Sequence, residues 1–120
     1  MAREGHDEAA VDELLLFIEN DGDLYRQRAQ PIMTNLAKKM RKGTYDSAKA
    51  VTLWKYLADA GAQKYTKEFG GGVDSRGRSN GTYGIFGVPE RKEVAKELSS
   101  RFEQMVRDGE LSAEALAKGR

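Results

Sequence analysis

Few side chains in this sequence could carry catalysis or hold a metal ion. His6 is the only histidine and cysteine is absent, which excludes a thiolate nucleophile, a disulfide framework and cysteine-ligated zinc. We expect His6 to be a solvated tail histidine. Glu8, Asp12 and Glu13 share a helical face by i, i+4 spacing and could hold a divalent cation or act as an acid/base pair, although carboxylates so spaced more often form a solvated face. We therefore predict that the chain is not an enzyme and has no metal site and no cofactor.

The glycine-rich segment 70–88 is a second candidate for chemistry, because seven of its nineteen residues are glycine. Glycine-rich loops can cradle phosphate, but no GK[ST] motif follows and no strand precedes, which argues against a nucleotide-binding loop. Arg76 and Arg78 could clamp a phosphate or a carboxylate; the alternative is a mobile loop that its arginines keep solvated. Asn80-Gly81 is typical of a tight turn, so the segment could also form a small β-hairpin. The candidate partner-binding residues are Arg76, Arg78, Asn80, Tyr83 and Phe86.

Charge is segregated along the chain. Residues 1–25 carry eight acidic side chains and one basic, whereas residues 26–56 carry eight basic and one acidic, although the net charge is only +1. The basic stretch could follow a nucleic-acid backbone, with Tyr45 or Tyr83 stacking on a base. The acidic head could instead neutralise the basic middle within the fold, and cations at the end of a helix also complement its dipole. The candidate nucleic-acid-binding residues are Arg26, Arg28, Lys38, Lys39, Arg41 and Lys42.

The elements that position these side chains are predicted by apolar residues at helical spacing. Such stripes indicate four main helices. Their apolar positions are Val11, Leu14, Leu15 and Ile18; Tyr25, Ala29, Ile32, Met33, Leu36 and Met40; Ala50, Leu53, Trp54, Leu57, Gly61 and Tyr65; and Val94, Leu98, Phe102 and Met105. Trp54, Tyr56 and Tyr65 are expected in the core rather than at an interface.

Pro31 interrupts the second stripe. Either the helix begins at Gln30 with Pro31 in its first turn, or a longer helix from about Asp23 kinks there. Because Tyr25 and Ala29 keep phase with the later apolar residues, we predict a kinked or two-piece helix.

The predicted fold class is all-α: a compact bundle of four main helices plus a short C-terminal helix, with a Gly-rich loop or small β-hairpin between the third and fourth helices. Gly43 is the expected stop of the second helix and Asp46 the N-cap of the third. The short C-terminal helix would run from Ser112 to Leu116. The chain is expected to be a single domain of residues 1–120, with residues 1–8 mobile.

Composition narrows the setting of the protein. The chain is 32% charged with a mean hydropathy of -0.68, which excludes a membrane span and argues against wholesale disorder. No secretory signal is visible, so a cytoplasmic location is expected.

Two long runs of the sequence, ENDGDLYRQRAQPIMTNLAKKMRKG followed by YDSAKAVTLWKYLADAGAQKYTKEF, and a later one, VPERKEVAKELSSRFEQ, carry a family likeness. The chain resembles an uncharacterised family of short helical proteins encoded by phages and other mobile elements. The resemblance implies a helical fold and a phage-like origin, and it supplies no catalytic residue.

Two functions remain open. The first is a non-catalytic interaction protein of phage or mobile-element origin that binds a host protein or ribonucleoprotein complex as an anti-defence inhibitor, with the loop providing the anchors. The alternative is a non-specific nucleic-acid-binding module that uses the basic middle segment. Homodimerisation through a leftover apolar helix face is a further expectation.

Overall fold

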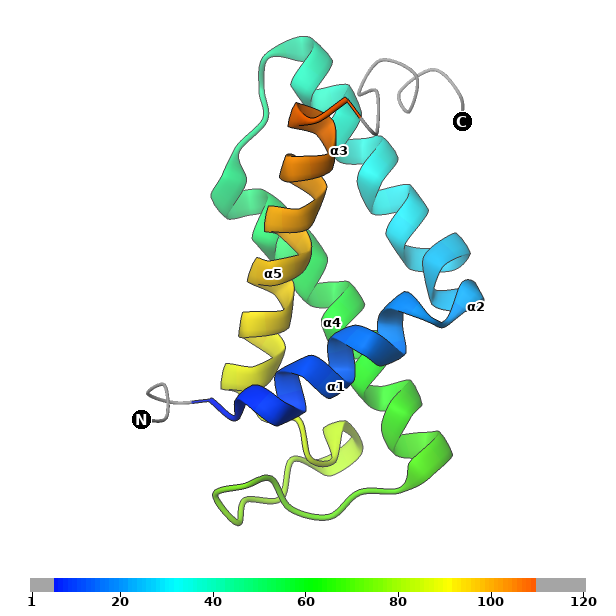
Figure 1. The fold of residues 1–120 in the computed structure, drawn as a ribbon, viewed down its shortest axis with the longest axis vertical. Coiled ribbons are helices and arrows are strands. Elements are labelled where there is room, and N and C mark those ends of the chain that lie inside the picture. The colour runs from blue at the N-terminus through cyan, green and yellow to red at the C-terminus, as the bar shows by residue number, and fades with distance from the viewer. Residues whose placement is uncertain (1–5, 110–120) are drawn as a thin grey trace.

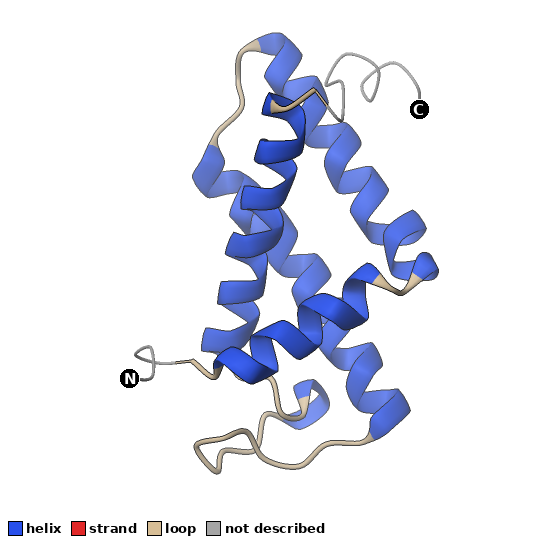
Figure 2. Cartoon of the chain, viewed as in Figure 1, coloured by secondary structure: helices blue, strands red, loops and turns tan. Residues whose placement is uncertain are grey.

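The computed structural model describes residues 6–109, and over these residues the chain is a compact helical bundle (Figures 1 and 2). The all-α prediction with four main helices is confirmed for this part of the chain. The predicted C-terminal helix of residues 112–116 lies outside it. The helices are α1 (Glu8–Glu19), α2 (Gly22–Leu24), α3 (Gln30–Lys42), α4 (Ser47–Phe69) and α5 (Val88–Arg107), with a π-helical turn η1 (Tyr25–Ala29) and a 3₁₀ turn η2 (Gly81–Tyr83).

Short-range hydrogen bonds define the helix ends. Asp7 and Asp46 cap α1 and α4, each accepting two backbone N–H bonds through its side chain. Gly43 ends α3 with a φ of 75°, a left-handed conformation that glycine adopts without steric penalty. The predictions for Asp46 and Gly43 are confirmed.

Pro31 produces a π turn rather than a break. From Gly22 the chain stays helical to Lys42, but the N–H of Gln30 bonds to the carbonyl of Tyr25, five residues back. Proline lacks an N–H and clashes with the carbonyl four residues earlier, and the wider turn before it accommodates both effects. The two-piece helix predicted from about Asp23 is therefore confirmed, with a π turn at the junction.

The core forms around α4, which packs against both α5 and α1. Trp54 of α4 is buried, and its ring centroid lies 5.8 Å from that of Phe102. Tyr65 is half-buried in an aromatic cluster with Phe17 and Phe86. The expectation that Tyr56 lies in the core is wrong: it is 60% exposed, because it lies on the opposite side of α4 from the buried residues.

The glycine-rich segment crosses one end of the bundle as a loop (Figure 1). Its only paired β residues are Val73 and Ser79, which form a single antiparallel bridge, and no longer strand occurs within residues 6–109. The hairpin considered at Asn80-Gly81 is not formed there. Asn80 instead precedes the 3₁₀ turn η2, and its side chain bonds to the Asp74 carboxylate and the Gly84 carbonyl.

Gly61 tests the close packing of α1 on α4. A Cβ at this buried position would lie 2.7 Å from Cγ1 of Ile18. We expect Gly61→Ala to lower the free energy of unfolding by about 1–3 kcal/mol, because overpacking outweighs the gain in helix propensity. Urea denaturation measures the change. Gly72→Ala is the control, since nothing lies within 4 Å of its added Cβ; equal stability of the two variants would contradict this packing.

Candidate nucleic-acid interface

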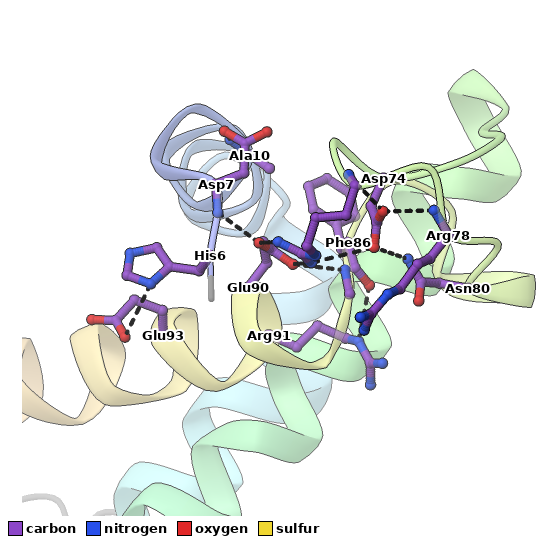
Figure 3. A network of polar contacts seen from close by, with 12 residues as sticks. His6, Asp7, Ala10, Asp74, Arg78, Asn80, Phe86, Glu90, Arg91 and Glu93 are labelled. Carbon is purple, nitrogen blue, oxygen red and sulfur yellow. Dashed lines mark hydrogen bonds and ion pairs between the residues drawn. The ribbon is translucent and has the colours of Figure 1, made fainter. Parts of the chain in front are cut away.

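A buried carboxylate, Glu90, joins three parts of the chain at the loop end of the bundle (Figure 3). Its Oε2 accepts the backbone N–H of Asp7 at 2.6 Å and Nη1 of Arg76 at 2.9 Å. Its Oε1 accepts Nη2 of Arg76 at 2.6 Å and the backbone N–H of Gly87 at 3.1 Å. The start of α1, the loop and the start of α5 therefore meet at one fully buried side chain.

A second carboxylate, Asp74, organises the loop itself. It accepts the backbone N–H groups of Arg76 and Arg78, both at 2.9 Å, and Nδ2 of Asn80 at 3.0 Å. Nη2 of Arg76 also approaches it to 3.2 Å. Together Asp74, Arg76 and Glu90 form the carboxylate clasp, which fixes the loop against α5.

The clasp engages the side chains of two of the five predicted partner-binding residues. Arg76 and Asn80 donate hydrogen bonds to the carboxylates of Glu90 and Asp74. Phe86 is 0% exposed and belongs to the core. Phe86 is thus wrong as a surface anchor. Tyr83 lies under the guanidinium of Arg91, 3.6 Å from its ring centroid. Arg78 is the predicted loop residue whose side chain remains exposed without an ion pair in residues 6–109.

Arg91 of α5, which the sequence analysis did not single out, contacts the loop at Phe86 and Tyr83. It is buried, donates from Nε to the carbonyl of Phe86 at 3.1 Å, and pairs with Asp59 at 3.0 Å. These contacts explain why Phe86 and Tyr83 turn inward.

His6 is not a solvated tail residue. Its side chain is 9% exposed and lies 3.2 Å from Glu8 and 3.9 Å from Glu93. Within the described part of the chain, no group of three His, Asp or Glu side chains is placed to hold a metal ion.

The acidic side chains of residues 1–25, here called the acidic head, form ion pairs mainly with cations of α4 and α5. Asp21 lies 2.8 Å from Lys64 of α4, and Glu19 contacts Arg101 of α5. The hydrogen bond from Lys64 lowers the pKa of Asp21, and the same bond raises the pKa of Lys64. Within residues 6–109, Arg26 is the one predicted nucleic-acid-binding residue that the head neutralises, through Asp23 at 2.6 Å.

In the part of the chain that the structure describes, the predicted cations on η1 and α3 are therefore mostly left without a counter-charge. All are exposed, and within residues 6–109 none forms an ion pair apart from Arg26. No acidic residue occurs between Leu24 and Tyr45. We call this surface the α3 basic face, and its cations are Lys38, Lys39, Arg41 and Lys42 of α3 together with Arg28 on the preceding turn η1. The structure therefore brings the predicted nucleic-acid-binding residues onto one continuous helical segment.

A depression of about 470 Å³ lies along the same helix. Arg26 and Lys38 stand at its two ends, with uncharged polar side chains between them. Its lining residues are Arg26, Gln30, Pro31, Thr34, Asn35 and Lys38. Sequence reasoning missed the three uncharged polar residues because no charge or apolar pattern marks them.

The aromatic residues expected to stack on bases are occupied. Tyr45 is half-buried and donates its hydroxyl to Glu103; burial and the nearby carboxylate raise its pKa to about 12. Tyr83 is covered by Arg91. Tyr25 is instead 46% exposed on η1 beside Arg26, although its place in the apolar stripe predicted burial.

Comparison of the chain with protein-family models, with curated proteins and with solved structures finds no match. The resemblance to phage-encoded helical proteins therefore stays a prediction. None of the helices in residues 6–109 has the length and apolar character required to span a membrane.

The clasp predicts a particular acid response. The hydrogen bonds from Asn80 and the Arg78 N–H hold the pKa of Asp74 at about 2, below 3.8 for an ordinary aspartate. Burial would raise the pKa of Glu90, but Arg76 and the Asp7 N–H lower it overall. Both groups therefore stabilise the fold above about pH 4, and this contribution is lost as the pH falls toward 2.

Asp74→Asn removes one of these titrating groups. We expect the stability of the variant to depend less steeply on pH between about pH 4 and pH 2 than that of the wild type, as measured by urea denaturation. Asp12→Asn is the control, because the side chain of Asp12 is exposed and makes no hydrogen bond within residues 6–109. Identical profiles for wild type and Asp74→Asn would contradict the role assigned to Asp74.

Proposed function

We propose that this protein is a non-catalytic binding protein that contacts nucleic acid through the α3 basic face. One observation carries the proposal: the cations of this face are exposed and unpaired within the described residues, while the acidic head pairs with Lys64 and Arg101 elsewhere. An uncompensated row of cations is the electrostatic footprint of a protein that binds a phosphate backbone.

Helix-dipole complementation accounts for only part of this charge. The negative end of α3 lies at Gly43, so the dipole favours cations only within the last turn, where Lys39, Arg41 and Lys42 lie. Arg28 lies more than two turns before that end. A polyanion that follows the helix is the partner that would use the whole row.

A loop-centred protein partner has less support. Of its predicted anchors, Phe86 is buried and Arg76 and Asn80 are engaged in the clasp. Binding to a host protein or ribonucleoprotein complex as an anti-defence inhibitor, and homodimerisation, stay predictions. Arg78 is the loop residue best placed for such a contact, since its side chain is exposed.

Charge reversal tests the proposal. We expect the wild type to bind duplex and single-stranded DNA with an affinity that falls steeply between about 50 and 200 mM salt. Lys38→Glu/Lys39→Glu/Arg41→Glu should weaken binding by at least about tenfold. It should also reduce the salt slope by about 3, since each phosphate contact contributes about 0.9 to the slope. Fluorescence anisotropy gives both quantities.

The matched control reverses the same number of charges elsewhere. Lys67, Lys92 and Lys96 are exposed and form no ion pair within residues 6–109. Their triple Glu variant should keep most of the affinity and most of the salt slope. An equal loss in the two triple variants would mean that net charge, not the α3 basic face, governs binding. No binding of any DNA or RNA by the wild type at low salt would overturn the proposal.

A further inference from the structure

We propose that α3 enters the major groove of duplex DNA and that Gln30, Thr34 and Asn35 contact base edges there. This inference rests on the proposed function and makes it more specific, because it assigns sequence selectivity to a surface otherwise explained by charge alone.

The shape of α3 suits a groove. The helix has 13 residues, a length of about 20 Å, and its buried side chains are Met33, Leu36 and Ala37. Asn35 and Lys38 are exposed, as is Pro31. Figure 1 shows α3 at the edge of the bundle, where it runs away from α1. A helix with its side chains is about 10–12 Å across, and the major groove of B-DNA is about 12 Å wide.

The chemistry of the depression suits base edges. Gln30 and Asn35 carry amides, which can pair bidentately with the N6 and N7 positions of adenine, and Thr34 can contact a thymine methyl or an acceptor. In residues 6–109 none of these three side chains makes a hydrogen bond. Their polar groups are therefore not committed to holding the fold.

The order of side chains along the helix separates positioning from readout. Arg26 and Lys38 stand at the two ends of the depression, and Lys39, Arg41 and Lys42 continue beyond it. Lys38, Lys39, Arg41 and Lys42 would bind phosphates and set the position of the helix, while the uncharged side chains of the depression face the bases. Arg26, at the other end, is paired with Asp23 at 2.6 Å. No acidic residue occurs in the sequence between Leu24 and Tyr45, and the carboxylate of Asp23 lies beside Arg26 at the start of this segment.

The π turn adds a further feature at this site. It places Arg26, which lines the depression, on a turn that is wider than an α-helical one. Turns of this kind are frequent at functional sites. The major groove of A-form RNA is too deep and narrow for such a helix, which makes duplex DNA the expected partner.

Selection from a pool of DNA duplexes with a randomised centre tests the inference. We expect the wild type to enrich a short motif and to bind it more tightly than unselected duplex. Gln30→Ala/Asn35→Ala should reduce that preference by between about fivefold and a hundredfold, while affinity for unselected duplex and the salt slope stay unchanged. Both substitutions are on the helix surface and favour helix, so circular dichroism should show an intact fold.

The control is Gln63→Ala/Gln104→Ala, which removes two exposed amides from α4 and α5. It should leave the preference intact. Binding of unselected duplex without enrichment of any motif would overturn the inference and leave the proposed function standing. The same holds if Gln30→Ala/Asn35→Ala keeps the full preference, or if RNA duplexes compete as well as DNA. Absence of binding to every duplex would overturn both proposals.

Discussion

The positive charge on α3 depends on where the acidic side chains of the head find their counter-charges. Asp21 pairs with Lys64 and Glu19 contacts Arg101, so the head is held against α4 and α5. Because these partly exposed pairs use acids that could have neutralised the cations of η1 and α3, α3 keeps its positive charge at the surface. Surface ion pairs contribute little to stability individually. Their consequence here is the distribution of potential over the molecule, which sets what the protein attracts.

The carboxylate clasp has a complementary role at the other end of the bundle. A buried glutamate is unfavourable unless it is paired and fully hydrogen-bonded, and Glu90 meets that condition only when Arg76 and the Asp7 backbone are both in place. The glycine-rich loop is thereby ordered without a hairpin. It functions as a structural cover of the core, with Phe86 beneath it, rather than as a free arm.

Local features of the fold could be predicted from the sequence, whereas the contacts of the loop could not. Asp46 and Gly43 act within one helical turn of themselves, so their residue types suffice. The pairing of Arg76 with Glu90 spans fourteen residues and depends on how the loop meets α5, which no periodicity reveals. The exposure of Tyr56 follows from which side of α4 the other helices cover. The cations of the α3 basic face could be identified by their charge, but whether each finds an acidic partner depends on tertiary structure.

Backbone amide NMR shifts, followed as a short DNA duplex is added, show directly whether the α3 basic face binds DNA. We expect the largest shifts and line broadening within residues 26–42, with residues 70–88 little changed. Shifts centred on the glycine-rich loop, with α3 unaffected, would contradict it and return the binding function to the loop.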